Sequence, residues 1–258
     1  MKIIVLIKQI LDPRGITVRR DKERIFVNVE EYIIDPGSKA AIEAALRFRG
    51  EGDELIALSM GKAQADDALR EALAMGCDAA YLVSDKAFKD ADISLTVRVL
   101  AAAIEKLGGA DLVLTGRESG DTGAGQIGPR LAEALGYAQV TDAYTLSNAA
   151  GALQATRRWA PGYTLVEAAL PTVVTVAPEA FPPRYAHGAR IISAYREWSV
   201  PVWSAADLGL GEEALAPLLS FRGETFPPPL EVGEKYRGDP GSVAQDVVAA
   251  LKMQKLIG

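Results

Sequence analysis

Cysteine and histidine are almost absent from the sequence, which has one of each in 258 residues. The single cysteine, Cys77, excludes an internal disulfide and any cysteine-rich zinc or iron–sulfur site, and it favours a reducing compartment. The single histidine, His187, excludes metal sites built from several histidines and leaves any Ser-His-Asp triad dependent on one residue of a proline-rich segment. Sequence signatures of catalysis are therefore scarce.

Clusters of positive charge and long apolar runs are also missing. Lys and Arg number 28 against 34 Asp and Glu, a net charge of −6, and no basic cluster supplies the face that nucleic acid requires. No run approaches the roughly 20 apolar residues of a membrane span. The apolar run at residues 3–7 is shorter than the roughly 7–15 residues of a signal-peptide core. We therefore expect a globular protein that binds no nucleic acid and inserts into no membrane.

Short apolar runs alternate with helical patterns over the first half of the chain. The runs cover residues 2–7, 54–58, 79–83 and 111–115, and helices are predicted over residues 39–49, 61–75, 93–107 and 126–135. Continuous apolar runs of this length are typical of strands buried on both faces. The pattern predicts an α/β fold: a doubly wound, mostly parallel sheet with helices on both faces, of the Rossmann-like type that binds adenine nucleotides.

The rest of the chain departs from this alternation. An inserted hairpin is predicted within residues 13–29, and further strands at residues 144–147, 153–158, 163–168 and 172–177 extend or flank the sheet. We expect a nucleotide-binding domain over residues 1–177. Residues 178–258 would form a recognition loop without helical or strand period at residues 186–193, a proline-rich arm, and a C-terminal helix at 240–256. That helix packs on this domain or on a partner.

A glycine-rich loop at residues 116–129 is the most informative stretch. It follows a predicted strand and opens a helix, where exposed amides and the helix dipole favour phosphate. Residues 123–128 also match the dinucleotide fingerprint, but six residues separate that match from its strand and the required acidic residue is misplaced. The alternative to a phosphate site is a flexible connection.

Two more strand-to-helix corners, at residues 35–38 and 59–61, fall at the same edge of the predicted sheet. Each alone is typical of a simple helix cap, but with the glycine loop they indicate a mononucleotide pocket. An adenine-nucleotide hydrolase or synthetase would need a cationic clamp and metal-binding carboxylates, for which only Arg117, Glu118 and Asp121 are candidates. A non-catalytic nucleotide sensor is the third alternative.

Several segments together resemble the β subunit of electron transfer flavoprotein, collinearly over nearly the whole chain. They are residues 2–10, 35–46 and 58–61, the Ala-Met-Gly-Cys-Asp run at 74–78, the loop at 121–128, and Leu-Pro-Thr-Val-Val-Thr at 170–175 followed by Pro-Arg-Tyr at 183–185. The resemblance implies a non-catalytic electron carrier that forms a heterodimer. In it the α subunit holds most of an FAD, and electrons pass from flavin dehydrogenases to a quinone reductase or another acceptor. It also implies AMP bound to this chain, and a cytoplasmic location, or the mitochondrial matrix in a eukaryote.

The family's functional residues carry over at two places. The resemblance assigns nucleotide binding to Leu6, Asp35, Pro36, Gly37, Ser38, Met60, Gly116, Arg117, Glu118, Ser119, Gly120, Asp121, Thr122, Gly123, Ala124, Gly125, Gln126 and Ile127. It assigns recognition of partner dehydrogenases to an arm at about residues 176–198, with Arg184, Tyr185, Gly188, Ile191 and Ile192 as candidates.

Some positions depart from the family pattern. Gly188 stands where well-known members have an anchoring leucine, so Ile191 and Ile192 are the expected substitutes. Pro13 and Thr164 replace an aromatic and an acidic residue that some members place near the flavin. Members that bifurcate electrons hold a second FAD in place of AMP and typically have Asp-Gly-Asp-Thr-Ala-Gln in the loop. Asp-Thr-Gly-Ala-Gly-Gln at residues 121–126 lacks the second acid, which favours AMP, with a second FAD as the alternative.

Overall fold

The computed structural model describes residues 1–149, 151–220, 225–228 and 233–258. Contacts within the chain define a larger unit, Met1–Phe221, and a smaller unit, Arg222–Gly258. The larger unit includes residues after 177, because these segments pack on the sheet and its helices. There α5 (Gly188–Arg196) contacts α2 (Asp66–Met75), and β13 (Val202–Trp203) pairs with β7 (Ala79–Val83).

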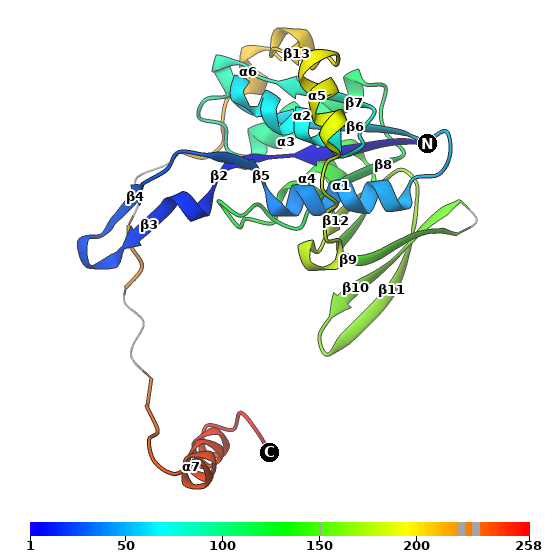
Figure 1. Cartoon of the computed structure of the whole chain (residues 1–258). Coiled ribbons are helices and arrows are strands. Elements are labelled where there is room, and N and C mark those ends of the chain that lie inside the picture. The colour runs from blue at the N-terminus through cyan, green and yellow to red at the C-terminus, as the bar shows by residue number, and fades with distance from the viewer. Residues whose placement is uncertain (150, 221–224, 229–232) are drawn as a thin grey trace. The chain divides into compact units, whose positions relative to one another are not determined.

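A nine-stranded sheet forms the centre of the larger unit, in the order β11-β10-β9-β12-β8-β1-β6-β7-β13 (Figure 1). The strands β9, β12, β8, β1, β6, β7 and β13 pair in parallel, and β10 and β11 extend the sheet beyond β9 as antiparallel strands. The predicted doubly wound α/β fold is confirmed. The strands not yet given bounds are β1 (Lys2–Ile7), β6 (Glu54–Met60), β8 (Leu112–Gly116), β9 (Ala138–Ala149), β10 (Ala152–Trp159), β11 (Gly162–Ala169) and β12 (Thr172–Val176).

Helices cover both faces of the sheet. Along β1, Ile3 and Val5 enter the core beneath α1 (Pro36–Phe48) and α2, whereas Ile4 and Leu6 enter the core beneath α3 (Ile93–Lys106) and α4 (Ile127–Leu135). Side chains of a strand alternate between faces, so a strand covered on both sides must be apolar throughout. This explains the uninterrupted apolar run at the N-terminus.

The segment between β1 and α1 forms two small antiparallel pairs. The predicted hairpin is present as β3 (Ile16–Arg19) and β4 (Arg24–Val27), and it extends away from the nine-stranded sheet in Figure 1. Two further strands, β2 (Gln9–Leu11) and β5 (Tyr32–Ile34), pair with each other and were not predicted from the sequence. Two of the shorter helical segments are the 3-10 turns Ala63–Ala65 and Lys86–Phe88, and another is α6 (Glu212–Leu215).

The expectation that residues 186–193 lack regular structure was wrong, because α5 occupies most of them. His187 caps this helix by accepting the amide of Ala189 at 3.3 Å. The Arg190 guanidinium donates to the carbonyl oxygens of Leu73 and Ala74, at the end of α2. The helix is held mainly by such polar contacts, because Ala194 is its one buried residue.

The smaller unit contains α7 (Pro240–Met253). The Asp239 carboxylate accepts the amides of Gly241 and Ser242, and Pro240 takes the first helical position, as the sequence predicted. Val248, Met253 and Leu256 expose much of their side chains within this unit. In the part of the chain that is described, none of the helices combines the length and apolar character that a membrane crossing requires.

Candidate functional site

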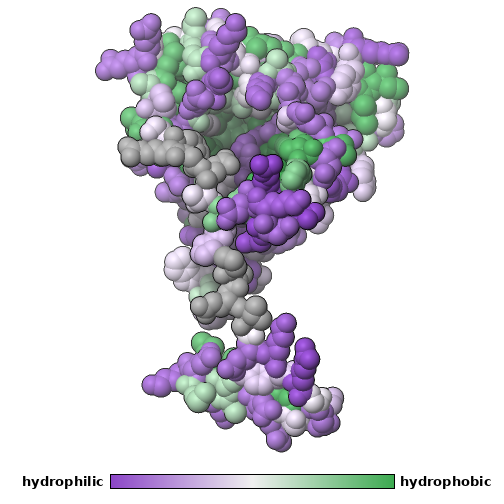
Figure 2. Space-filling model, turned by 90° about the vertical axis from the view of Figure 1, so that its left-hand side faces the viewer, coloured by the Kyte–Doolittle hydropathy of each residue, from purple (hydrophilic) through white to green (hydrophobic). Residues whose placement is uncertain are grey.

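A cavity of about 780 Å³ lies at the carboxyl ends of β1, β6, β7 and β8. The chain runs outward from β1 through β6 to β7 and then returns to the other side of β1 as β8, so strand order reverses at β1. Ligands of open α/β sheets bind at such a reversal, and the volume is within the roughly 300–1,000 Å³ of small-molecule sites. Figure 2 shows this side of the molecule, where a hollow with apolar side chains in its depth has hydrophilic ones around it.

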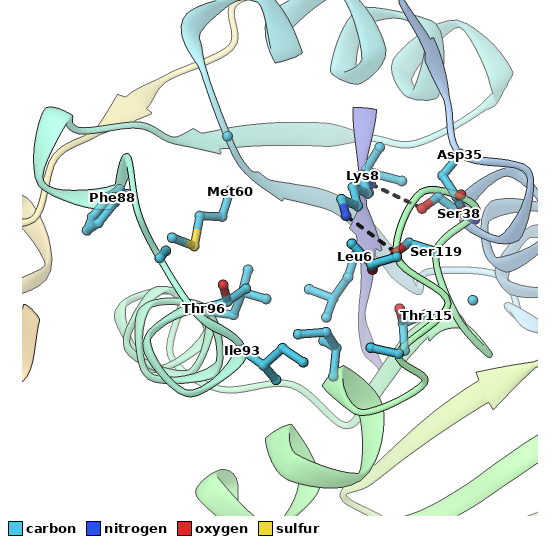
Figure 3. A pocket seen from close by; sticks show the side chains of 18 of the residues that line it. Leu6, Lys8, Asp35, Ser38, Met60, Phe88, Ile93, Thr96, Thr115 and Ser119 are labelled. Carbon is cyan, nitrogen blue, oxygen red and sulfur yellow. Dashed lines mark hydrogen bonds between the residues drawn. The ribbon is translucent and has the colours of Figure 1, made fainter. Parts of the chain in front are cut away.

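The three corners singled out in the sequence meet at this cavity. The predicted residues that line it are Leu6, Asp35, Ser38, Met60, Gly116, Arg117, Glu118, Ser119, Thr122, Ala124, Gly125, Gln126 and Ile127. Five predicted residues belong to the same corners but do not line the cavity: Pro36, Gly37, Gly120, Asp121 and Gly123. Figure 3 shows Lys8, Asp35, Ser38 and Ser119 on one side of the cavity, with Met60, Phe88, Ile93 and Thr96 on the other.

The N-terminus of α4 opens into the cavity without a side-chain cap. Gln126 precedes the helix, makes no capping hydrogen bond, and lines the cavity together with Ile127. The first turn of α4 also contains no acidic residue. Each other α-helix of the described residues has a side-chain cap or an acidic first turn. The free amides and the positive end of the α4 dipole therefore face the cavity, which favours an anion there.

Asp35 fastens the glycine loop to the start of α1. Its buried carboxylate accepts the amide of Gly120 at 2.6 Å and that of Ser38 at 3.2 Å. The two backbones approach so closely that a Cβ on Gly37 would lie 2.9 Å from the carbonyl oxygen of Glu118, and one on Gly116 would lie 2.7 Å from the carbonyl carbon of Gly37. These two glycines are needed for the close approach of the corners, and the loop is thereby held in one position.

Lys8 is committed to the same loop. Its Nζ atom lies 2.6 Å from Oδ1 of Asp121 and 3.3 Å from Oγ of Ser119, and its amide donates to Oγ of Ser38 at 3.1 Å. Burial raises the pKa of Asp121, but the hydrogen bonds from Lys8 and Ser119 outweigh it and hold that pKa below its ordinary value. The Lys8 charge is thus largely balanced, and Asp121 supports the loop from outside the cavity lining.

Arg117 is likewise surrounded by carboxylates. One guanidinium nitrogen lies 3.0 Å from Oδ1 of Asp142 and 3.7 Å from Glu179, and another lies 3.8 Å from Glu118. The hydrogen bond with Asp142 raises the pKa of Arg117 above its ordinary value. Among the described residues there is no group of three or more His, Cys, Asp or Glu side chains able to hold a metal ion. Arg117 is therefore not free to act as the cationic clamp that a nucleotide hydrolase would need.

A fourth corner, which was not predicted from the sequence, follows β7. It contributes Ser84, Asp85, Lys86, Phe88, Lys89, Ala91, Asp92 and Ile93 to the lining, and Thr96 and Leu100 follow on α3. Ser84 and Asp85 come directly after a predicted parallel strand, so the rule that placed the other corners at this edge would have placed this one too. Phe88, Ile93 and Leu100 give the cavity its apolar side.

The residues assigned to partner recognition lie outside the cavity. Arg184 is bound within the chain: its Nε atom lies 2.7 Å from Oε2 of Glu43, which is 3% exposed on α1. Tyr185 is 98% exposed. Gly188 begins α5, where Ile191 and Ile192 are 42% and 55% exposed. The structure therefore gathers the isoleucines on an exposed helix and gives Arg184 a structural partner.

Comparison with known proteins gives concordant matches. The family model of the electron transfer flavoprotein domain matches residues 24–208. The chain is 34% identical over 262 residues to the electron transfer flavoprotein subunit beta of Thermoanaerobacterium thermosaccharolyticum, and 35% identical over 265 residues to the caffeyl-CoA reductase-Etf complex subunit CarD of Acetobacterium woodii, with both chains covered completely in each case. It is 35% identical to protein FixA of Azorhizobium caulinodans over 81% of this chain and 77% of the relative.

The doubly wound sheet and the ligand-sized cavity at its switch point define a Rossmann-like α/β protein. The chain belongs to the electron transfer flavoprotein family, and its full-length matches include β subunits. It is an electron-transfer subunit of a flavoprotein, of a kind that pairs with an α subunit, and its relatives are carriers rather than enzymes. The resemblance found in the sequence is confirmed.

Proposed function

We propose that the cavity holds AMP as a structural ligand, and that this chain helps an α subunit hold an FAD. The complex carries electrons in the cytoplasm from flavin dehydrogenases to a quinone reductase or another acceptor. The observation that carries the AMP proposal is the uncapped N-terminus of α4 at the end of a fixed glycine loop. A phosphate there would satisfy amides that the protein leaves free.

The polar groups around this end suit a single phosphate. Ser119 and Thr122 lie within hydrogen-bond distance of each other, 2.8 Å between their hydroxyl oxygens, and both line the cavity. Lys8 and Arg117 are already paired with carboxylates, so the phosphate would be bound mainly by backbone amides and hydroxyl groups. Backbone donors and a helix dipole are sufficient for such a group.

The opposite side of the cavity suits a purine base. Met60, Phe88 and Ile93 line this side, as Figure 3 shows, and Thr96 adds a hydroxyl among them. An adenine ring buries apolar faces and needs polar partners at its edge, and the corner after β7 supplies polar side chains beside these apolar ones. The polar and apolar sides of one cavity thus correspond to the two ends of a mononucleotide.

A second FAD in place of AMP is the other candidate, and the lysines that follow β6 and β7 at the cavity favour it. Lys62, Lys86 and Lys89 line the cavity, and no ion pair joins them to a carboxylate among the described residues. They provide charge for a second phosphate, and about 780 Å³ leaves room beyond a mononucleotide.

The decisive experiment is to coexpress the full chain with an α subunit, purify the complex, denature it and identify the released nucleotides by mass spectrometry. We expect a yellow 1:1 complex that releases equal amounts of AMP and FAD, whereas the isolated chain retains AMP and little flavin. Two FAD per complex without AMP would establish the alternative. Release of ATP, or of no nucleotide besides one FAD, would overturn both assignments for the cavity.

A further inference from the structure

The carboxylate of Asp92 joins the cavity to the segment that leads out of the larger unit. Asp92 lines the cavity directly before α3 and is 8% exposed. Its Oδ1 atom accepts the amide of Leu95 at 2.7 Å and so caps α3. Its Oδ2 atom accepts the amides of Leu218 and Leu219, at 2.8 and 2.9 Å. One side chain therefore fixes both a wall of the cavity and a chain segment 126 residues further along.

Backbone contacts, more than burial, hold this segment. The side chains of Leu218 and Leu219 are 71% and 66% exposed, so they contribute little apolar burial. Besides Asp92, the Arg98 guanidinium on α3 donates to the carbonyl oxygen of Ala216 at 2.5 Å. Burial raises the pKa of Asp92, but the backbone hydrogen bonds outweigh it and hold that pKa below its ordinary value, so the carboxylate is charged at neutral pH. Removal of these contacts would release the segment.

We propose that Asp92 couples occupation of the cavity to attachment of the 216–219 segment. The inference rests on the proposed nucleotide site. A ligand in the cavity packs against Ala91, Ile93 and Thr96, which surround Asp92 at the first turn of α3. We take the ligand to bind only when the first turn of α3 is ordered. Binding then favours the ordered turn, and because Asp92 joins this turn to the segment, it also favours attachment of the segment. The coupling is reciprocal, so release of the segment weakens ligand binding.

Asp85 provides a matched control. It also lines the cavity, caps the 3-10 turn Lys86–Phe88 through the amide of Ala87 at 3.0 Å, and accepts the amide of Ala205 at 3.0 Å. It therefore resembles Asp92 in charge, capping and position at the cavity, but it holds a different part of the chain. A serine at either position retains a capping hydroxyl and removes the second carboxylate oxygen.

The test is amide hydrogen exchange at Leu218 and Leu219 in the full chain, with and without AMP, together with calorimetric titration of AMP. In the unsubstituted chain, AMP is expected to slow exchange at both amides by about tenfold. In the Asp92→Ser variant, both amides should exchange about tenfold faster without AMP, because they lose their hydrogen bonds to a charged acceptor. Their exchange should also no longer respond to AMP. In the absence of AMP, Asp85→Ser should leave exchange at Leu218 and Leu219 unchanged, because Asp85 accepts the amide of Ala205 and no amide of the 216–219 segment.

A second substitution outside the cavity, Arg98→Ala, should also speed exchange at both amides and weaken AMP binding by about twofold to fivefold through the reciprocal coupling. If AMP binds but exchange at Leu218 and Leu219 does not change, the coupling is wrong and the nucleotide site stands. If calorimetry shows no AMP binding, the proposed nucleotide fails and coupling to AMP fails with it. Equal exchange in the unsubstituted and Asp92→Ser chains without AMP would show that Asp92 is not the anchor.

Discussion

At the scale of single residues, Gly125 is the most sensitive position of the proposed phosphate site. Its φ of +62° lies in the left-handed region, and it lines the cavity just before α4. A β-branched side chain is strained there and would reshape the loop that positions the amides of α4. We predict that Gly125→Val abolishes retention of nucleotide during purification, measured by mass spectrometry of the denatured protein.

The matched control is Gly136, which follows α4 with a φ of +66° and where an added Cβ would have open space within 4 Å. Gly136→Val imposes the same kind of backbone strain at the other end of the helix, so it should lower stability without loss of nucleotide.

Asp121→Asn should weaken retention less than Gly125→Val, because Asp121 supports the loop from outside the lining. Equal retention in Gly125→Val and the unsubstituted chain would remove the loop from the site.

Glu43 makes stability depend on pH. Burial raises its pKa, but the hydrogen bonds from Arg184 and Arg47 outweigh this and hold the pKa below its ordinary value of 4.5. A carboxyl group whose folded-state pKa is lowered stabilises the fold above its unfolded pKa, and this contribution is lost as pH falls through the folded pKa. Glu43→Gln should therefore lower the free energy of unfolding at pH 7 by roughly 1–3 kcal/mol, with the difference narrowing below about pH 4.5.

Urea unfolding of the chain and its variants across this pH range measures the effect. Glu71→Gln is the control, because Glu71 pairs with Lys39 at 2.6 Å on the surface, where its side chain is 39% exposed. Exposed pairs contribute only about 0–1 kcal/mol, so this variant should change stability little at any pH. A pH-independent difference for Glu43→Gln would show that the loss comes from packing and not from the charge.

At the scale of secondary-structure elements, α5 carries the exposed isoleucines that we propose for partner recognition. Ile191 and Ile192 present apolar side chains on a helix that polar contacts hold against α2. We predict that Ile191→Ala combined with Ile192→Ala slows electron transfer from a cognate dehydrogenase by about tenfold or more and leaves the flavin spectrum and the heterodimer intact. Stopped-flow reduction of the flavin measures the rate.

Val202→Ala is a suitable control for this prediction, since Val202 is 55% exposed but lies on β13 at the edge of the sheet. It should transfer electrons at the unsubstituted rate. An unchanged rate in the double isoleucine variant would instead remove these residues from the recognition surface. Because Arg184 is bound to Glu43, its substitution tests stability and is not a clean test of recognition.

Whether a helix or strand could be predicted from the sequence depends on which interactions hold it in place. The strands and long helices bury continuous apolar faces, and their periodicity identified them. In α5 only Ala194 is buried, and Arg190 helps to hold the helix by donating to the carbonyl oxygens of Leu73 and Ala74. Contacts between elements so far apart in the chain cannot be read from the sequence. Likewise β2 and β5 have three residues each, too few to show a period.

At the scale of the whole molecule, a bound nucleotide should stabilise the fold. A ligand that binds only the native state raises stability by mass action, about 2.7 kcal/mol when its free concentration is 100 times its Kd. We predict that the thermal unfolding midpoint of the nucleotide-free chain rises steadily with added AMP. Gly125→Val should show no such rise, and adenosine, which lacks the phosphate, should have a smaller effect. A midpoint independent of AMP would contradict the proposed ligand.

The whole molecule also shows which parts of the candidate site can be inferred from the sequence. Three corners could be placed together because parallel strands end at one edge of a sheet, and this follows from topology without side-chain detail. Which polar groups are free could not be read in advance. Lys8 and Arg117 are paired with Asp121 and Asp142, and these partners lie 113 and 25 residues away in the chain. Its charge made Arg117 a candidate for binding phosphate, but in the structure its guanidinium pairs with Asp142.

The central place of β1 governs how the chain must assemble. This strand precedes the other strands of the sheet in the chain, yet its two neighbours are β6 and β8, and its pairing with β8 joins Ile3 to Leu112. Until β8 is complete, one edge and part of both apolar faces of β1 have no partner, and contacts of such long sequence separation form slowly. At synthesis rates of about 5–20 residues per second, the nascent N-terminal half spends seconds with an exposed apolar strand. Molecular chaperones that shield such strands would be most useful in that interval.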